Sequence, residues 1–217
     1  MLQRLRVVQE VAARIADAAE NAVEDYRSGL VEQEPALTDR ILGGVSEAMR
    51  NYRSRGILWS AKTLTDRGPR SQESLYGADL HVALDVDSPE HRIQKGFLAQ
   101  AKLVEAGSSF SRTEWKRLSD QCKAMLRLSP DSYVLLYSRQ GISVVPANAI
   151  VGTRTFCNPH ELYSRGFATF LEAFLESFVG DNRLGNASAA TLEGLLAASE
   201  AERLLLLTAF QGSPAAV

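Results

Sequence analysis

Two stretches of alternating side chains, residues 79–86 and 93–104, stand shortly before a helix-capping sequence at residues 111–114. Alternation with a period of two is typical of a β-strand that has one buried face. Ser111-Arg112-Thr113-Glu114 is a capping box, because a serine side chain and a glutamate three residues later bind the first free amides of a helix. Two strands followed directly by a helix predict an α/β domain with helices packed against a sheet.

The rest of the chain extends this order. Apolar residues recur at helical spacing over residues 5–26 and 34–52, and short β-type runs occupy residues 57–64, 132–137 and 141–146. Residues 162–179 are rich in Phe and Leu, residues 187–210 are rich in Ala and Leu, and both are predicted to be helices. The expected architecture is a mixed central sheet flanked by helices, with an α-β-β-β-α-β core and extra helices at both ends.

A chain of 217 residues, 45% of them hydrophobic, suits one domain with one sizeable core. Within it we expect an N-terminal helix at residues 1–29, a core at 30–150 and a C-terminal helical extension at 160–217. Cys122 and Cys157 follow no disulfide or metal spacing and are expected to be buried thiols. No apolar run approaches the roughly 20 residues that span a bilayer, so a cytoplasmic protein without membrane contact is predicted.

The net charge of −2 excludes a generally polycationic protein, so any contact with nucleic acid must come from a local patch. One candidate patch lies on the helix that the capping box starts. At 100° per residue, its basic residues fall within about 60° of arc and could follow a phosphate backbone; they are Arg112, Lys116, Lys123 and Arg127. Lys95, on the strand before, is added to this predicted nucleic-acid surface. An ordinary solvated helix face is the open alternative.

Asp79 begins the first alternating stretch, and Gln100-Ala101-Lys102 lies inside the second. Residues two apart in a strand share a face, so Gln100 and Lys102 point the same way. An acid, an oxygen ligand and an ammonium group brought together suit the cleavage of a phosphodiester. His81 shares a face with Asp79 and could line the same site.

These residues and this element order, over roughly Glu34 to Pro146, resemble the PD-(D/E)XK nuclease superfamily, whose members have a restriction-endonuclease-like core. The resemblance assigns Asp79 to the metal-binding aspartate, Gln100 to the acid position of the (D/E)xK element and Lys102 to its lysine. Glu34 is assigned to the helical acid in preference to Glu47, because position 34 extends the apolar stripe that faces the sheet. Gln100 departs from the usual acid. Some branches with glutamine there are associated with prokaryotic defence against phage and foreign DNA.

The resemblance implies a Mg²⁺ site, with Mn²⁺ as a possible substitute, formed by Asp79, Gln100 and the backbone carbonyl of Ala101. Lys102 would orient the attacking water or neutralise charge on the transition state. DNA is the expected substrate, with RNA left open, and a second copy of the chain or a partner protein of a defence system is the expected companion. The alternative is a catalytically silent module on the same fold that binds nucleic acid or protein.

Overall fold

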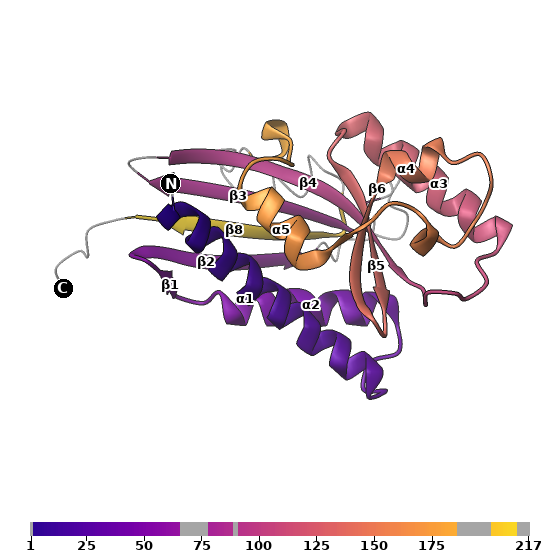
Figure 1. Cartoon of the computed structure of the whole chain (residues 1–217), viewed down its shortest axis with the longest axis horizontal. Coiled ribbons are helices and arrows are strands. Elements are labelled where there is room, and N and C mark those ends of the chain that lie inside the picture. Colours follow the sequence, from indigo (N-terminus) through magenta and orange to yellow (C-terminus); the bar gives the residue numbers. More distant parts are fainter. Residues whose placement is uncertain (1, 66–77, 89–90, 186–200, 212–217) are drawn as a thin grey trace.

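The computed structural model of the chain describes residues 2–65, 78–88, 91–185 and 201–211. These residues form one mixed eight-stranded sheet in the order β1-β2-β8-β3-β4-β5-β6-β7, with helices on both faces (Figure 1). The predicted α/β class is confirmed. The strands are β1 (Tyr52–Ser54), β2 (Ile57–Thr65), β3 (Leu80–Ser88), β4 (His91–Leu103), β5 (Ser132–Ser138), β6 (Gly141–Pro146), β7 (Arg165–Gly166) and β8 (Arg203–Phe210).

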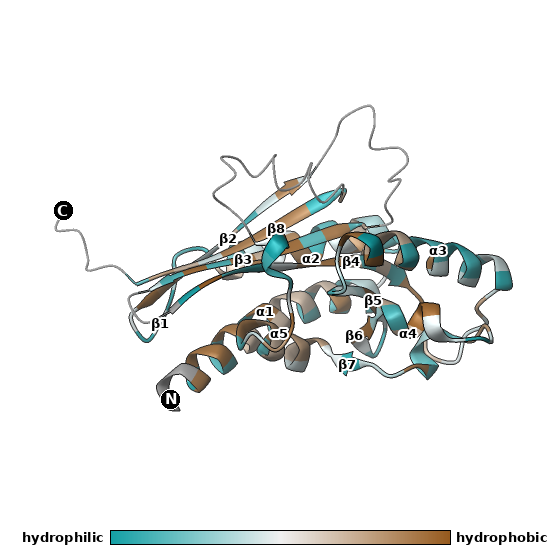
Figure 2. Cartoon of the chain, turned by 90° about the horizontal axis from the view of Figure 1, so that it is seen from above, coloured by the Kyte–Doolittle hydropathy of each residue, from teal (hydrophilic) through white to brown (hydrophobic). Residues whose placement is uncertain are grey.

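The helices divide between the two faces of the sheet. One face packs against α1 (Leu2–Arg27), α2 (Glu34–Ala48) and α5 (Phe167–Leu175), and the other against α3 (Arg112–Leu128) and α4 (Ala147–Gly152). Figure 2 shows α1 and α5 on one side of the sheet. Two short 3₁₀ helices, η1 (Pro159–Glu161) and η2 (Asn182–Leu184), complete the described elements. No helix among the described residues is both long and apolar enough to cross a membrane.

The elements predicted from alternation and capping form as expected. Ser111 Oγ accepts a hydrogen bond from the Glu114 amide at 3.1 Å, and Glu114 Oε2 accepts one from the Ser111 amide at 2.8 Å. The helix that follows buries Trp115, Leu118, Cys122 and Met125 against the sheet. Cys122 is buried as predicted, whereas Cys157 is half-buried.

Of the two helices predicted in the C-terminal third, the one within residues 162–179 forms over Phe167–Leu175 as α5, and the one over residues 187–210 was wrong where it can be checked. Residues 203–210, expected to be helical, form β8, which lies between β2 and β3, antiparallel to the first and parallel to the second. The run Leu204–Leu207 buries alternate side chains on opposite faces of the sheet. A continuous apolar run is what a strand covered on both faces requires, and this burial outweighs the helix preference of leucine. Residues 187–200 of the predicted helix lie outside the described residues.

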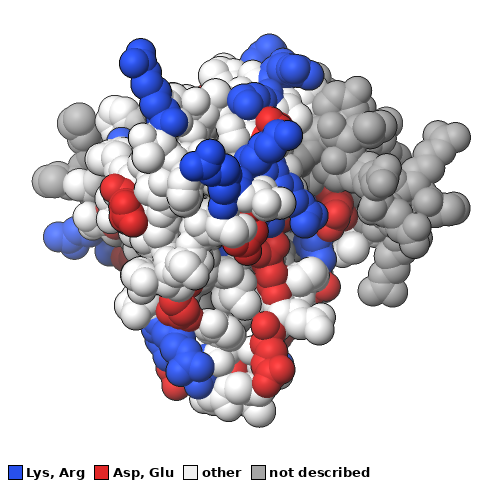
Figure 3. All heavy atoms as spheres, turned by 90° about the vertical axis from the view of Figure 1, so that its right-hand side faces the viewer, with Lys and Arg blue, Asp and Glu red and all other residues white. Residues whose placement is uncertain are grey.

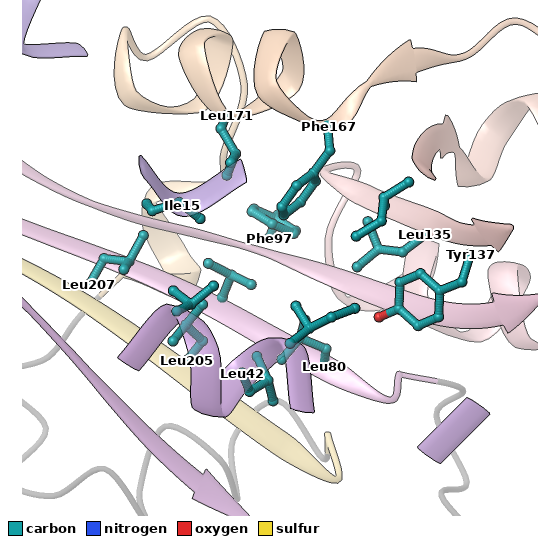
Figure 4. Close-up of a pocket in the computed structure, with 14 residues that line it drawn as sticks. Ile15, Leu42, Leu80, Phe97, Leu135, Tyr137, Phe167, Leu171, Leu205 and Leu207 are labelled. Carbon is teal, nitrogen blue, oxygen red and sulfur yellow. The ribbon is translucent and has the colours of Figure 1, made fainter. Parts of the chain in front are cut away.

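The core on the α1 side contains a cavity of about 30 Å³ (Figure 4). Its wall is apolar apart from the Tyr137 hydroxyl and includes Ile15, Val45, Phe97 and Leu207. Such a cavity stays dry because a water molecule inside it would lack polar partners. It is a packing gap and not a ligand site.

Candidate active site

Asp79 and Gln100 are neighbours across two antiparallel strands. The β3–β4 register pairs Leu80 with Ala99, so Asp79, one residue earlier, stands opposite Gln100. The Asp79 amide donates to the Ala99 carbonyl at 2.9 Å, which continues the ladder beyond the end of β3. The Asp79 carboxylate accepts hydrogen bonds from the Ala101 amide at 2.9 Å and from the Gln100 side-chain amide. The predicted pairing of this acid with this glutamine is therefore present.

Gln100 is almost completely buried, with 1% of its surface exposed. Its Nε2 atom donates to Asp79 Oδ2 and lies 3.3 Å from the Ala101 carbonyl oxygen. Its Oε1 atom is buried and has no hydrogen-bond partner among the described residues. The NH₂ side of the amide thus contacts two acceptors, and the oxygen side has no hydrogen-bond donor among the described residues.

Lys102 and Glu34 form the second half of the site. Lys102 Nζ lies 3.2 Å from Glu34 Oε1, and Glu34 Oε2 accepts a hydrogen bond from the Leu103 amide at 2.7 Å. Glu34 is the first residue of α2, where the helix dipole favours a negative charge. Glu47 instead pairs with Arg50 on the surface at 2.7 Å. The geometry thus brings Glu34, and not Glu47, to the Lys102 side chain.

Two buried hydroxyl groups support the start of α2. Thr38 Oγ1 donates to the Glu34 carbonyl at 3.0 Å and lies 3.4 Å from the Tyr137 hydroxyl on β5. Burial is the main cause that raises the pKa of Tyr137, and the Thr38 contact opposes that shift. The helix turn that carries Glu34 is therefore tied to the strand beside β4.

Burial raises the pKa of Asp79 to about 6. The nearby charge of Lys102 and the hydrogen bond from the Ala101 amide oppose this rise, while the charges of Glu202 and Glu34 add to it. The carboxyl group is therefore ionised at neutral pH and becomes protonated under mildly acidic conditions.

Arg203, the first residue of β8, and Glu202 before it are two charged residues that sequence reasoning missed. The β3–β8 register pairs Leu80 with Arg203, and the Arg203 amide donates to the Asp79 carbonyl at 3.1 Å. The Arg203 side chain is 7% exposed and binds Asp39 at 2.6 Å and Glu202 at 2.9 Å. These residues were missed because residues 203–210 were predicted to be helical. The signal was the run Leu204–Leu207, whose length also suits a fully buried strand.

The predicted basic residues of α3 lie on its exposed side. Arg112, Lys116, Lys123 and Arg127 are all exposed. The Arg112 guanidinium also stacks 5.0 Å from the centre of the Phe156 ring, and Lys123 lies 3.1 Å from Asp120. Figure 3 views the end of the molecule where α3 lies and shows Lys and Arg side chains gathered there, with Asp and Glu side chains beside them. We name these four residues the α3 basic stripe.

Lys95 does not belong to this surface, and its assignment to nucleic-acid binding was wrong. Its residue is 2% exposed. The Nζ atom donates to the carbonyl oxygens of Phe174 and Val179, at 2.9 Å for the latter, and lies 4.7 Å from the centre of the Phe174 ring. These carbonyls lie at and beyond the C-terminal end of α5, where the helix dipole favours a cation. Lys95 is a buried structural cation.

His81 shares the sheet face of Asp79 but faces a different neighbour. It is 1% exposed, and its Nε2 atom lies 2.8 Å from the Leu184 carbonyl oxygen in η2. The ring therefore packs under η2, and the expectation that it lines the site is not met.

The residues at Asp79 fit a hard cation with oxygen ligands. Within the described ranges, no three His, Cys, Asp or Glu side chains lie close enough to hold a metal ion. The available donors are instead the Asp79 carboxylate, the Ala101 carbonyl and the Gln100 amide, whose buried Oε1 has no partner among those residues. Mg²⁺ takes oxygen ligands, commonly one or two carboxylates, and retains several waters. A set with one carboxylate and two neutral oxygens satisfies that requirement.

Comparison with known proteins finds no matching family model, no matching curated protein and no matching solved structure. The geometry of the side chains therefore carries the functional assignment.

Proposed function

We propose that this protein is a metal-dependent nuclease that hydrolyses phosphodiester bonds in DNA. One observation carries the proposal: Asp79, Gln100, Lys102 and Glu34 come from three elements and lie in two adjoining contacts at one end of the sheet. The exposed α3 basic stripe belongs to the helix that follows β4 directly. The proposal includes a cytoplasmic role in prokaryotic defence, because Gln100 resembles the glutamine variant of the PD-(D/E)XK pattern that is associated with such systems. It also includes a second copy of the chain or a partner protein.

Each residue has a role that follows from its position. Asp79, the Ala101 carbonyl and the Gln100 amide oxygen would hold Mg²⁺ or Mn²⁺, which supplies Lewis acidity and an activated water when bound. Lys102 is the cation beside that site and would neutralise charge that develops on the phosphate. Glu34 orients Lys102 through the 3.2 Å ion pair and is itself fixed by the Leu103 amide.

The element order supports membership of the PD-(D/E)XK superfamily. The segments α2, β2, β3, β4, α3 and β5 follow in the order of that core, with the short β1 between α2 and β2. The acid position stands directly before β3 and the lysine position on β4. Strand β8, inserted between β2 and β3, is an addition to that order.

The test is incubation of the protein with supercoiled plasmid DNA and MgCl₂, with a parallel arm in which RNA replaces the plasmid. We expect nicked or linear DNA in the wild type and none with EDTA. Asp79→Ala and Lys102→Ala should each lower the rate by at least about 100-fold, since each removes a ligand or a charge at the reacting centre.

Asp85→Ala is the matched control. Asp85 also stands opposite a glutamine, Gln94, on the same two strands, but this pair is at the exposed far end of β3. The control should cleave like the wild type. Cleavage that survives both Asp79→Ala and Lys102→Ala would overturn the proposed site.

A second candidate is a catalytically silent module that binds nucleic acid or protein. It is favoured by the neutral Gln100 and by the pairing of Lys102 with Glu34, which offsets the lysine charge. This candidate predicts salt-sensitive DNA binding with no cleavage under any divalent cation.

A further inference from the structure

The Gln100 amide presents its donor side to two acceptors. Its Nε2 atom donates to Asp79 Oδ2 and lies 3.3 Å from the Ala101 carbonyl oxygen. Both partners are oxygen atoms that offer lone pairs, so the oxygen side of the amide would be repelled by them. The NH₂ side can face these two oxygens directly because it donates hydrogen bonds to them. The Oε1 side can face them only when a cation lies between the three oxygen atoms.

The opposite side of the same amide is not satisfied. Oε1 is buried and has no partner among the described residues, in a residue that is 1% exposed. A buried acceptor without a hydrogen bond is costly, and native structures contain few of them. Each such group calls for an explanation, and a functional role is one of the recognised explanations.

We propose that Gln100 is a metal ligand with two positions. Without metal, its NH₂ group takes the place of the cation between Asp79 and the Ala101 carbonyl. When a divalent cation binds, the amide turns by half a rotation about its last side-chain bond and Oε1 becomes a ligand. The inference rests on the metal site of the proposed nuclease, and it adds that binding must displace an internal hydrogen-bond donor.

The proposal gives the glutamine a purpose that a glutamate could not serve. A glutamate at position 100 would place a second negative charge beside the half-buried Asp79 carboxylate when no cation is present. The glutamine keeps the metal-free site paired, but the displaced hydrogen bonds weaken metal binding. The wild type should therefore bind Mg²⁺ more weakly than Gln100→Glu.

The chain contains an internal comparison. Gln94 stands opposite Asp85 on the same pair of strands, and its Nε2 atom lies 3.3 Å from Asp85 Oδ1. Gln94 is exposed, so its oxygen side is open to water. The two glutamines share partner type and strand pair and differ in burial and in the second acceptor at Ala101.

The experiment titrates Mg²⁺ into ¹⁵N-labelled full-length protein without nucleic acid and follows the side-chain amide signals by NMR. The Gln100→Met variant, which is close in volume, assigns the Gln100 signals by their loss. We expect these signals to shift in a saturable way, with the affinity that calorimetry gives for Mg²⁺, while the Gln94 signals stay in place. Unmoved Gln100 signals at saturating Mg²⁺ would overturn the proposal.

Calorimetry on Gln100→Glu supplies the second arm. This variant should bind Mg²⁺ roughly tenfold or more tightly, because it adds a charged ligand, and its metal-free melting temperature should fall by roughly 2–4 °C or more. Gln94→Glu should change neither quantity. If Gln100→Glu does not fold without metal but folds in Mg²⁺, the proposal is supported; unchanged affinity contradicts it.

The two proposals can fail separately. Moving Gln100 signals without cleavage of any nucleic acid would leave the two-position ligand standing and remove the nuclease function. Mg²⁺-dependent cleavage with Gln100 signals that do not respond would do the reverse.

Discussion

Asp79 is half-buried directly before β3, and the loss of hydration raises the pKa of its carboxyl group more than Lys102 and the Ala101 amide lower it. Its pKa rises from 3.8 to about 6 as a result. Between these two values the folded protein holds a proton that the unfolded chain has released. Stability therefore falls as the pH rises through this window, and the penalty is complete above about pH 6.

Asp79→Asn should remove this penalty. The asparagine carbonyl can accept the same hydrogen bonds without ionising, so the variant should exceed the wild type by about 1–3 kcal/mol in free energy of unfolding above pH 6. The difference should vanish below about pH 4. Urea titrations in EDTA from pH 4 to 8 measure it, and a difference that does not change with pH would contradict the burial argument.

Asp181→Asn should show the opposite sign. The pKa of Asp181 is lowered to about 2, chiefly by hydrogen bonds from Arg183, so its ionised form stabilises the fold above the ordinary value of 3.8. This contribution is lost as the pH falls through about 2. Asp181→Asn should therefore be less stable than the wild type at pH 7 in the same urea titrations. Equal stability at pH 7 would mean that the Arg183 contact contributes nothing.

At the scale of elements, α3 joins a buried face to an exposed basic one. Trp115, Leu118 and Cys122 hold the helix on the sheet, while the α3 basic stripe stays in solvent. Phosphate contacts of this kind are independent of sequence and are weakened by salt.

Arg112→Ala with Lys116→Ala should weaken DNA binding to a similar extent on unrelated sequences. The slope of log affinity against log salt should fall by about 2, one for each lost phosphate contact. Fluorescence anisotropy at several salt concentrations measures both effects. Arg55→Ala with Arg92→Ala removes the same charge away from α3 and should leave the slope unchanged. An equal effect of both double variants on the slope would contradict DNA binding at the α3 basic stripe.

Lys95→Met should separate stability from binding. The substitution removes the donor to the Phe174 and Val179 carbonyls, and buried acceptors left unpaired cost about 1–3 kcal/mol. Urea unfolding should detect this loss, while the DNA affinity measured by anisotropy should stay at the wild-type value. A change in DNA affinity without a change in the free energy of unfolding would show that Lys95 contributes to DNA binding.

Local patterns predicted the elements whose ends or faces are marked by particular side chains. The capping box located the start of α3, and strand parity placed Gln100 and Lys102 on one face. The same parity places Lys95 with Phe97 on the buried side, but its charge led to a surface assignment. The carbonyl acceptors that Lys95 binds belong to Phe174 in α5 and to Val179 after it, 79 and 84 positions away, and no local pattern contains them. Strand β8 was not predicted for a related reason. Four consecutive leucines also suit a helix, and the two strands that make them a strand, β2 and β3, lie far away in the sequence.

At the scale of the whole molecule, the sheet separates two cores, and the gap of about 30 Å³ lies in the one covered by α1, α2 and α5. Val45 is 1% exposed and lines this gap from α2. A single added methylene is close to the size of the gap.

Val45→Ile should therefore stabilise the protein by about 0.5–1 kcal/mol, following roughly 24 cal/mol for each Å³ of cavity. Thermal unfolding should show a melting temperature about 1–4 °C higher. Val134→Ile adds the same methylene on the other face, away from the gap, and should destabilise by overpacking. Equal effects of the two substitutions would show that the gap accepts no added group.

The position of β8 also sets when the site is completed during biosynthesis. Until residues 203–210 leave the ribosome, β3 has only β4 as a neighbour, and the Asp79 carbonyl lacks its partner amide from Arg203. Glu34, Lys102 and the whole of α3 are translated well before that moment. The nascent chain thus carries the chemical groups of the site long before it carries the strand that fixes them, so any activity of this site begins only after residues 203–210 have been made.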